Sequence, residues 1–270
     1  MALTKVGKEG VVGLDNSADA TAINISSGEN VGIGVVPETT WNSNIDALQL
    51  GLGASIYGDN TATGLQISAN AVATLGSSLN GYKYIGSDKA STYQQYDGEH
   101  NFRVASSGSA DGAITWSTAM TINNTGAVTK PLQPAFLAVP ASSQANIPIN
   151  GATTVAFGTE IFDNNSDFAS NTFTAPVAGK YQLQYTATYN SMDVDSDYVE
   201  HLLITSNRNY QIVVDPDGFD ADPLYHTFNI CVLADMDASD TAYIRIGMNN
   251  SGQAQMDIST SSYFSGYLVC

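Results

Sequence analysis

A strand, a tight turn and a second strand are predicted by the segment Phe173-Thr174-Ala175-Pro176-Val177-Ala178-Gly179-Lys180-Tyr181. Gly179 allows the turn and Pro176 stiffens its entry, while Phe173 and Tyr181 supply large side chains for a core. From Tyr181 to Tyr189, apolar or aromatic residues alternate with Gln and Thr. This period is typical of an antiparallel strand with one face on a core and the other in water.

The chain stops on another apolar segment, Phe264-Ser265-Gly266-Tyr267-Leu268-Val269-Cys270. An unpaired apolar strand at a free terminus would fray and aggregate, so we expect this segment to complete a sheet. Residues 242–248 alternate in the same way. Together with the turns between them, these strands predict one jelly-roll sandwich over residues 135–270.

This C-terminal part resembles the jelly-roll head shared by the complement globular heads and the tumour-necrosis-factor family. The family pattern Phe-Thr-x-Pro-x-x-Gly-x-Tyr is matched from Phe173 to Tyr181, and Phe264 to Leu268 match the terminal strand. The resemblance implies a homotrimeric binding module and not an enzyme. No collagen-like Gly-X-Y stalk precedes the head, so the biology of complement is not implied.

Composition changes near Lys130-Pro131-Leu132-Gln133-Pro134. Most of the glycines lie before this segment, whereas seven of the eight prolines lie within or after it. Because proline forces extended backbone, we expect a stiff linker here and a separate head at 131–270.

The preceding residues, 41–130, read as short strands with Gly, Asn and Ser turns. Ala47 to Leu52 and Gly64 to Ser68 alternate with a period of two. Strands this short and glycine-rich are expected to bury no core within one chain. We therefore predict an intertwined β shaft in which three chains pack together.

A weak internal repeat supports a shaft. Residues 20–28 resemble residues 117–126, and each copy ends in a glycine that is followed shortly by Val31 or Val128. With residues 96–102 between the copies, this strand-turn unit resembles repeats in the shafts of bacteriophage tail-fibre proteins. The resemblance implies an all-β, homotrimeric fibre whose residues 1–40 attach to other virion proteins.

The charge balance excludes several partners. Only 13% of residues are charged, and 9 basic against 26 acidic residues give a net charge of −17. Nucleic acid is excluded because its phosphates would be repelled. No apolar run is long enough to span a membrane, and no signal peptide is recognisable at the start, so we expect a virion protein released without secretion.

Two acidic segments are candidate sites. Asp193, Asp195 and Asp197 alternate, so that their carboxylates could reach one Ca2+ ion, with solvated acidic loops as the alternative. No other cofactor is predicted. The receptor-binding candidates are Asp215, Asp217, Phe219, Asp222 and Tyr225.

Aromatic rings flanked by Asp and Asn suit a glycan, because ring faces stack on sugars and polar groups bond to hydroxyls. Tyr189, Tyr198 and Tyr210 are further aromatic candidates for exposed loops, with core or trimer contacts as the alternative. Cys231 is expected to be a small buried hydrophobic residue.

The function predicted from the sequence is adhesion of a viral fibre to a host cell surface. A head or neck fibre, or a decoration protein with a structural role, is one alternative. A tailspike-like polysaccharide depolymerase and a secreted bacterial adhesin are two others. The depolymerase requires a long parallel β-helix or a clear acid pair, which this sequence does not indicate.

Overall fold

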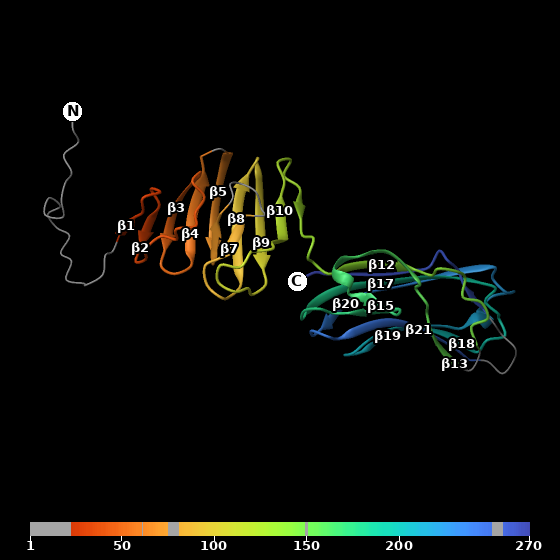
Figure 1. Ribbon diagram of the computed structural model, residues 1–270. Coiled ribbons are helices and arrows are strands. Elements are labelled where there is room, and N and C mark those ends of the chain that lie inside the picture. Colours follow the sequence, from red (N-terminus) through yellow and green to blue (C-terminus); the bar gives the residue numbers. More distant parts are fainter. Residues whose placement is uncertain (1–22, 61, 75–80, 149–150, 250–255) are drawn as a thin grey trace, which may run out of the picture. The chain divides into compact units, whose positions relative to one another are not determined.

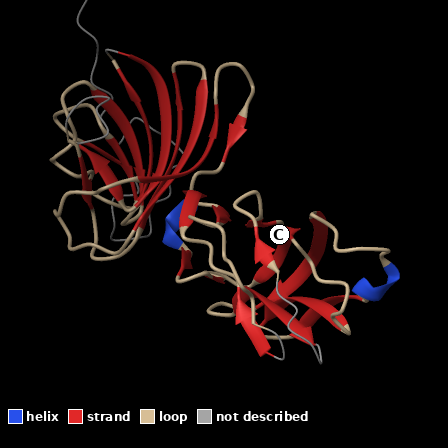
Figure 2. Cartoon of the chain, turned by 90° about the vertical axis from the view of Figure 1, so that its right-hand side faces the viewer, coloured by secondary structure: helices blue, strands red, loops and turns tan. Residues whose placement is uncertain are grey.

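The computed structural model describes residues 23–60, 62–74, 81–148, 151–249 and 256–270. The chain divides into two compact units, Met1–Pro131 and Leu132–Cys270. In these described ranges the regular structure is strand apart from two short 3-10 turns, η2 (Asn164–Ser166) and η3 (Pro216–Gly218) (Figures 1 and 2). The all-β expectation is confirmed. Within the same ranges, no helix has the length and apolar character to cross a membrane.

The N-terminal unit is built on one nine-stranded sheet with the order β1-β2-β3-β4-β5-β8-β9-β10-β11. The pair β2–β3 is parallel and the other pairs are antiparallel. A separate hairpin, β6–β7, completes the unit. The strands are β1 (Ile23–Ile25), β2 (Val31–Ile33), β3 (Ile45–Leu50), β4 (Ala54–Asp59), β5 (Ala62–Ala69), β6 (Ala71–Ala73), β7 (Tyr82–Tyr84), β8 (Ala90–Tyr96), β9 (Glu99–Ala105), β10 (Ser117–Ile122) and β11 (Val128–Thr129).

The two copies of the sequence repeat form hairpins, β1–β2 and β10–β11, at the two ends of the large sheet. In the second hairpin the side chain of Asn123 accepts hydrogen bonds from the backbone N–H groups of Thr125 and Ala127. Gly126 there has φ 88°, a left-handed conformation that favours glycine. In the first hairpin Glu29 is left-handed with φ 63°, and Ser26 Oγ accepts a hydrogen bond from the N–H of Asn30. The two copies therefore form similar turns.

One face of the nine-stranded sheet is covered by the β6–β7 hairpin. On this face the ring centroids of Trp41 and Tyr57 are 4.9 Å apart. The hydroxyl of Tyr82, in the hairpin, donates a hydrogen bond to Gln66 Oε1 at 2.5 Å. This unit therefore has a small core of its own. The expectation that these strands bury no core within one chain is wrong, because the hairpin and the Trp41 segment cover one face of the sheet.

The C-terminal unit is a sandwich of two antiparallel sheets, β14-β12-β23-β17-β20 and β15-β16-β21-β18-β19. Two short strands extend them, since β22 pairs with β17 and β13 pairs with β21. The strands are β12 (Ala135–Val139), β13 (Gly151–Thr154), β14 (Thr159–Asp163), β15 (Phe168–Ala169), β16 (Thr172–Thr174), β17 (Gly179–Asn190), β18 (Tyr198–Thr205), β19 (Asn209–Val214), β20 (Tyr225–Met236), β21 (Thr241–Asn249), β22 (Asp257–Ile258) and β23 (Tyr263–Leu268).

The core of this unit follows the alternation read from the sequence. Every second residue of β17 from Tyr181 to Tyr189 is fully buried. Phe136 of the first strand packs its ring against Phe168, Phe173 and Phe264, with centroids 4.8–5.0 Å apart. The last strand, β23, lies between β12 and β17 and so completes a sheet, as predicted.

The sequence pattern assigns Gly179 to the turn, but the structure requires a glycine here for a different reason. Its φ is not in the left-handed region. A Cβ atom at this position would lie 2.6 Å from Leu268 Cδ1 and 2.7 Å from the carbonyl oxygen of Cys270. The glycine therefore serves the close approach of the C-terminal strand.

One single-residue expectation is wrong, and one open alternative is decided. Cys231 is exposed, because β20 alternates and its neighbour Ile230 occupies the inward position. For Tyr189 the structure selects the core alternative over the exposed loop: the residue lies fully buried near the end of β17, in the same inward row as Tyr181.

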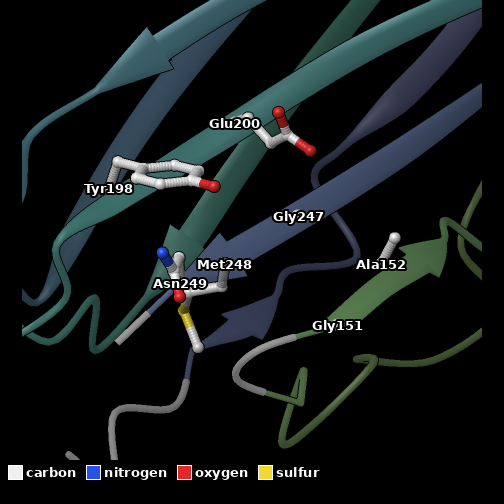
Figure 3. A pocket seen from close by; sticks show the side chains of 7 residues that line it. All are labelled: Gly151, Ala152, Tyr198, Glu200, Gly247, Met248 and Asn249. Atoms are coloured by element: carbon white, nitrogen blue, oxygen red, sulfur yellow. The ribbon is translucent and has the colours of Figure 1, made fainter. Parts of the chain in front are cut away.

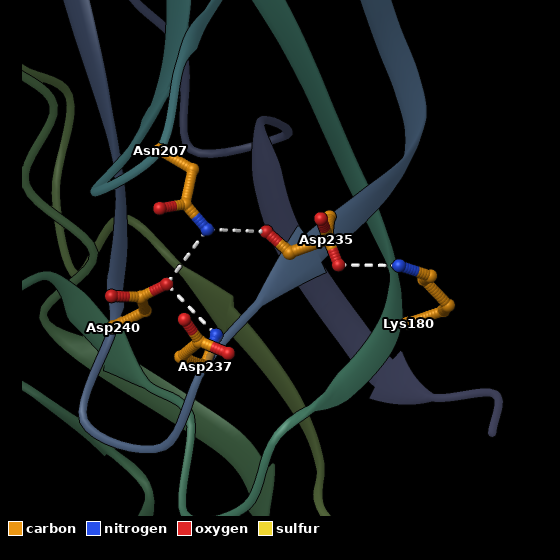
Figure 4. A network of polar contacts seen from close by, with 5 residues as sticks. All are labelled: Lys180, Asn207, Asp235, Asp237 and Asp240. Carbon is orange, nitrogen blue, oxygen red and sulfur yellow. Dashed lines mark hydrogen bonds and ion pairs between the residues drawn. The ribbon is translucent and has the colours of Figure 1, made fainter.

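A polar network ties the turns at the end of the sandwich nearest Cys270 (Figure 4). Lys180 and Asp235 form an ion pair across β17 and β20, and this pair lowers the pKa of Asp235 through hydrogen bonding and charge. Asn207 donates to the carbonyl oxygen of Asp235 and to Asp240 Oδ2, at 2.9 Å each. The network joins the β18–β19 turn to the β20–β21 turn.

Candidate binding surface of the C-terminal unit

The long strand β17 runs from one end of the sandwich to the other. At one end the N–H of Lys180 donates to the carbonyl oxygen of Cys270 at 2.7 Å, close to the point where the linker enters. At the other end Asn190 pairs with Tyr225 and with Asp257. Twelve residues in a strand span about 36 Å. We call the loops 191–197 and 215–224 at this second end the distal end.

The two loops of the distal end are joined by hydrogen bonds. The N–H of Val194 donates to Asp222 Oδ1 at 3.0 Å, and the N–H of Ser191 donates to the carbonyl oxygen of Leu224 at 3.2 Å. The structure therefore brings the predicted calcium segment beside the predicted receptor-binding segment. The sequence did not predict that these two segments are in contact, because the contact depends on how β17 and β20 pair.

Each loop is also shaped by its own carboxylates. Asp193 Oδ1 accepts from the N–H of Asp195 at 2.8 Å, and Asp215 Oδ1 accepts from the N–H of Asp217 at 3.2 Å at the start of η3. A side-chain hydrogen bond with Asp215, together with its like charge, raises the pKa of Asp217. These carboxylates are used in part as turn-forming groups.

The distal end is strongly acidic. Its two loops contain seven aspartates and neither lysine nor arginine. Asp195 and Asp197 are exposed, and Asp193 is half-buried. In the part of the chain that the structure describes, no three His, Cys, Asp or Glu side chains come together as a metal-binding group. Calcium binding by Asp193, Asp195 and Asp197 stays a prediction.

Exposed apolar groups accompany these charges. Tyr225 is 73% exposed at the start of β20, and Leu224 beside it is 74% exposed. Phe219 is half-buried because its ring packs edge-on against His226 at 5.3 Å. Leu224 was missed in the sequence, where an apolar residue after Pro223 could have drawn attention to it.

Beside the distal end, a pocket of about 310 Å³ opens on the outer face of the second sheet. Tyr198 and Glu200 line it from β18, and Asn249 lines it from β21 (Figure 3). A Cβ on Gly247 would lie 2.4 Å from Glu200 Oε1, so this glycine makes room for the carboxylate. Tyr198 was among the predicted exposed aromatics, whereas Glu200 and Asn249 meet it only through the pairing of β18 with β21.

A buried polar chain lies beneath this region. The hydroxyl groups of Tyr185 and Tyr189 are 3.0 Å apart, and the Tyr189 hydroxyl is 2.9 Å from Nδ1 of His201. His201 is fully buried, and burial lowers its pKa to about 3. The imidazole is therefore neutral and belongs to the core rather than to the surface.

The two antiparallel sheets and their pairing order define a jelly roll of the C1q and tumour-necrosis-factor type. The family model for the C1q domain matches residues 135–269, which is half of the chain. The chain therefore belongs to the C1q domain family. Domains of this fold typically form homotrimers.

Solved structures are similar to about half of the chain. The globular domain of zebrafish complement 1qA protein has 16% identity, and the match covers 51% of this chain and 98% of that one with a TM-score of 0.40. Murine APRIL at pH 5.0 has 9% identity, with coverage of 51% and 99% and a TM-score of 0.37. No curated protein matches the chain.

Proposed function

We propose that the protein is a homotrimeric fibre of a viral particle, a bacteriophage tail fibre, and that it adheres to a host cell surface through the distal end of its C1q-type head. In this proposal residues 1–40, most of which lie outside the described residues, attach to other virion proteins. Residues 41–130 form the shaft and residues 131–270 the head.

The observation that carries the proposal is the location of the distal end. Its exposed aromatic and apolar side chains, Tyr225 and Leu224, lie about 36 Å along β17 from the end at which the linker enters the head. Groups placed there lie at the opposite end of the head from the linker, where contact with another surface is sterically open. Three copies of such a site on one head would raise avidity without a tight single contact.

Trimerisation of the head is supported by its first sheet. Phe162, Leu233 and Tyr267 are exposed on strands of this sheet. Apolar side chains gathered on one sheet favour contact with another copy. The chemistry of the distal end favours a ligand with hydroxyl groups, since carboxylates accept hydrogen bonds and rings stack on sugar faces.

We propose further that the protein binds and does not catalyse, as its family is one of binding modules. Incubation of the protein with host polysaccharide, followed by an assay for new reducing ends, tests this part. We expect no release of reducing ends above that of a buffer control; sustained release would establish a depolymerase instead.

Adhesion is tested by incubating the fluorescently labelled full chain with a panel of bacterial strains. On a strain that the wild type binds, we expect Tyr225→Ala to lower bound protein at least fivefold. Tyr96→Ala is the matched control, because Tyr96 is an exposed tyrosine in the other unit. Binding that Tyr225→Ala leaves unchanged would contradict adhesion through the distal end.

A further inference from the structure

The face of the nine-stranded sheet opposite the β6–β7 hairpin carries a continuous row of apolar side chains. Each member is directly paired with the next across neighbouring strands. We call it the apolar row. Its members are Ile25, Val31, Leu48, Ile56, Ile67, Tyr93, Phe102 and Met120.

The covered face of the same sheet carries a polar row. Each member of this row is directly paired with the next across neighbouring strands, and all are buried. The members are Gln49, Ser55, Ser68, Thr92 and Arg103. Ser68 donates to Thr92 Oγ1 at 2.8 Å. A soluble antiparallel sheet normally buries its apolar face and exposes its polar face. Here the covered face combines this polar row with apolar core residues such as Tyr57 and Ala90, and the open face carries the apolar row.

The apolar row is open to water in the single chain. Ile67 is 46% exposed and Ile25 is 73% exposed, and within the N-terminal unit the described residues leave the row uncovered. Nine strands about five residues long give a face on the order of 600 Å² in projection. The apolar row crosses this face from strand to strand, and contiguous exposed apolar side chains on this scale mark an interaction surface. A specific interface buries a similar area, about 800 Å² per partner.

The charge of the protein indicates what can cover the row. With a net charge of −17, two copies repel unless they meet on a surface that is free of charge. The apolar row contains no ionisable carboxylate or amine, and Asp46 lies outside it, at one end of the sheet face. The row is therefore a surface on which one copy of this chain can approach another.

We propose that the apolar row is the contact surface between N-terminal units of identical chains, which pack their open sheet faces together around a shared apolar centre. The number of copies, three, rests on the proposed homotrimeric fibre. Sheets that pack face to face lie about 10 Å apart. The buried polar row then faces outward on each sheet, beneath its own hairpin.

Solvent access to the row tests this contact in the full chain. Cys231 and Cys270 are replaced by serine, and Ile67→Cys or Ile56→Cys is introduced singly. The rate of reaction with a water-soluble maleimide is measured, and sedimentation equilibrium gives the mass of each variant. Leu52→Cys is the matched control, because Leu52 is 86% exposed in the turn between β3 and β4 and lies outside the row.

We expect a trimer in which the thiols introduced by Ile67→Cys and Ile56→Cys react at least tenfold more slowly than the thiol of the control variant. Dissociation in mild denaturant should bring the rates together. A trimer with equal rates would overturn the contact surface and leave the proposed fibre standing. A monomer would overturn both, and a monomer with slow labelling would show that a segment of the same chain covers the row.

Discussion

Gly266 lies where three elements of the head meet. It belongs to β23, and a Cβ atom there would be 2.6 Å from Leu183 Cδ2 and 2.8 Å from Phe136 Cε1. Neither neighbour can move freely in the packed core, so Gly266→Ala is expected to lower the free energy of unfolding of the head by about 1–3 kcal/mol. Urea unfolding followed by near-ultraviolet circular dichroism measures this.

Two controls accompany that measurement. Gly218→Ala adds the same methyl group where nothing lies within 4 Å, so its effect should stay within about 0.5 kcal/mol. Trp41 and Trp116, the two tryptophans of the chain, both lie in the N-terminal unit. Their fluorescence midpoint should not change in either variant. Equal stability of both glycine variants would contradict the packing described for β23.

His201 makes the head sensitive to acid. Its pKa is lowered from 6.5 to about 3 by burial, so between these values the unfolded chain binds a proton that the folded chain does not. Stability is fully present above pH 6.5 and is lost as the pH falls toward 3. From pH 7 to pH 4 this group should lower the free energy of unfolding by about 3 kcal/mol.

The variant His201→Phe tests that assignment. It removes the titrating ring at a site packed against Phe228 and Tyr189, and with it the hydrogen bond to the Tyr189 hydroxyl. We expect lower stability at pH 7 but a fall between pH 7 and pH 4 that is smaller by about 3 kcal/mol than in the wild type. An unchanged pH dependence would show that other groups cause the acid sensitivity.

For single residues, the alternation of a strand predicts burial better than the character of the neighbouring residues does. Alternation placed Tyr181 and Leu183 correctly in the core. It failed for Cys231, whose apolar neighbours suggested burial although the residue falls on the outward phase of β20. It was right for Tyr189 as well, which the same alternation places on the inward face of β17, although its neighbour Asn190 had also made it a candidate loop residue.

At the scale of elements, a carboxylate and a backbone hydrogen bond join the two loops of the distal end. Asp222→Ala removes the acceptor of the Val194 N–H. We expect amide hydrogen exchange at Val194 to accelerate about tenfold, as the loss of about 1.4 kcal/mol of local stability would produce. Exchange measured residue by residue in the full chain gives the result.

Asp220→Ala is the control for that change, since it removes the same charge from the same loop at an exposed position. If both variants accelerate exchange equally, charge and not the hydrogen bond holds the loops together. Cell binding should fall further in Asp222→Ala than in Asp220→Ala, because the proposed surface needs both loops in place.

Strands were the most predictable elements. The alternations at 47–52 and 64–68 became parts of β3 and β5, and the repeat became two hairpins. The same alternation did not predict which face of the sheet would be covered. That choice depends on the β6–β7 hairpin, whose Ala71 carbonyl oxygen accepts a hydrogen bond from Ser55 of the polar row at 3.4 Å. Tertiary contacts of this kind leave no period in the sequence.

For the whole molecule, the composition predicts a large negative net charge, and the structure shows where part of that charge lies. A net charge of −17 says nothing of where the field is strongest. The fold gathers seven aspartates of two separate segments at the distal end, where neither loop has a basic residue. The surface proposed to meet the cell is therefore strongly acidic.

This arrangement predicts how adhesion depends on salt. Cell surfaces carry phosphate and carboxylate groups, which repel the distal end over a distance set by ionic strength. The screening length falls from about 30 Å at 0.01 M salt to about 8 Å at 0.15 M. We therefore expect the rate of association of the full chain with cells to rise severalfold over this range, the reverse of a protein that is steered by attraction. The double variant Asp217→Asn, Asp220→Asn should show a weaker rise, because it keeps Asp222 and Tyr225 in place and removes part of the repulsion. An association rate that falls with added salt would instead identify a positively charged receptor, for which the aspartates themselves are the contact groups.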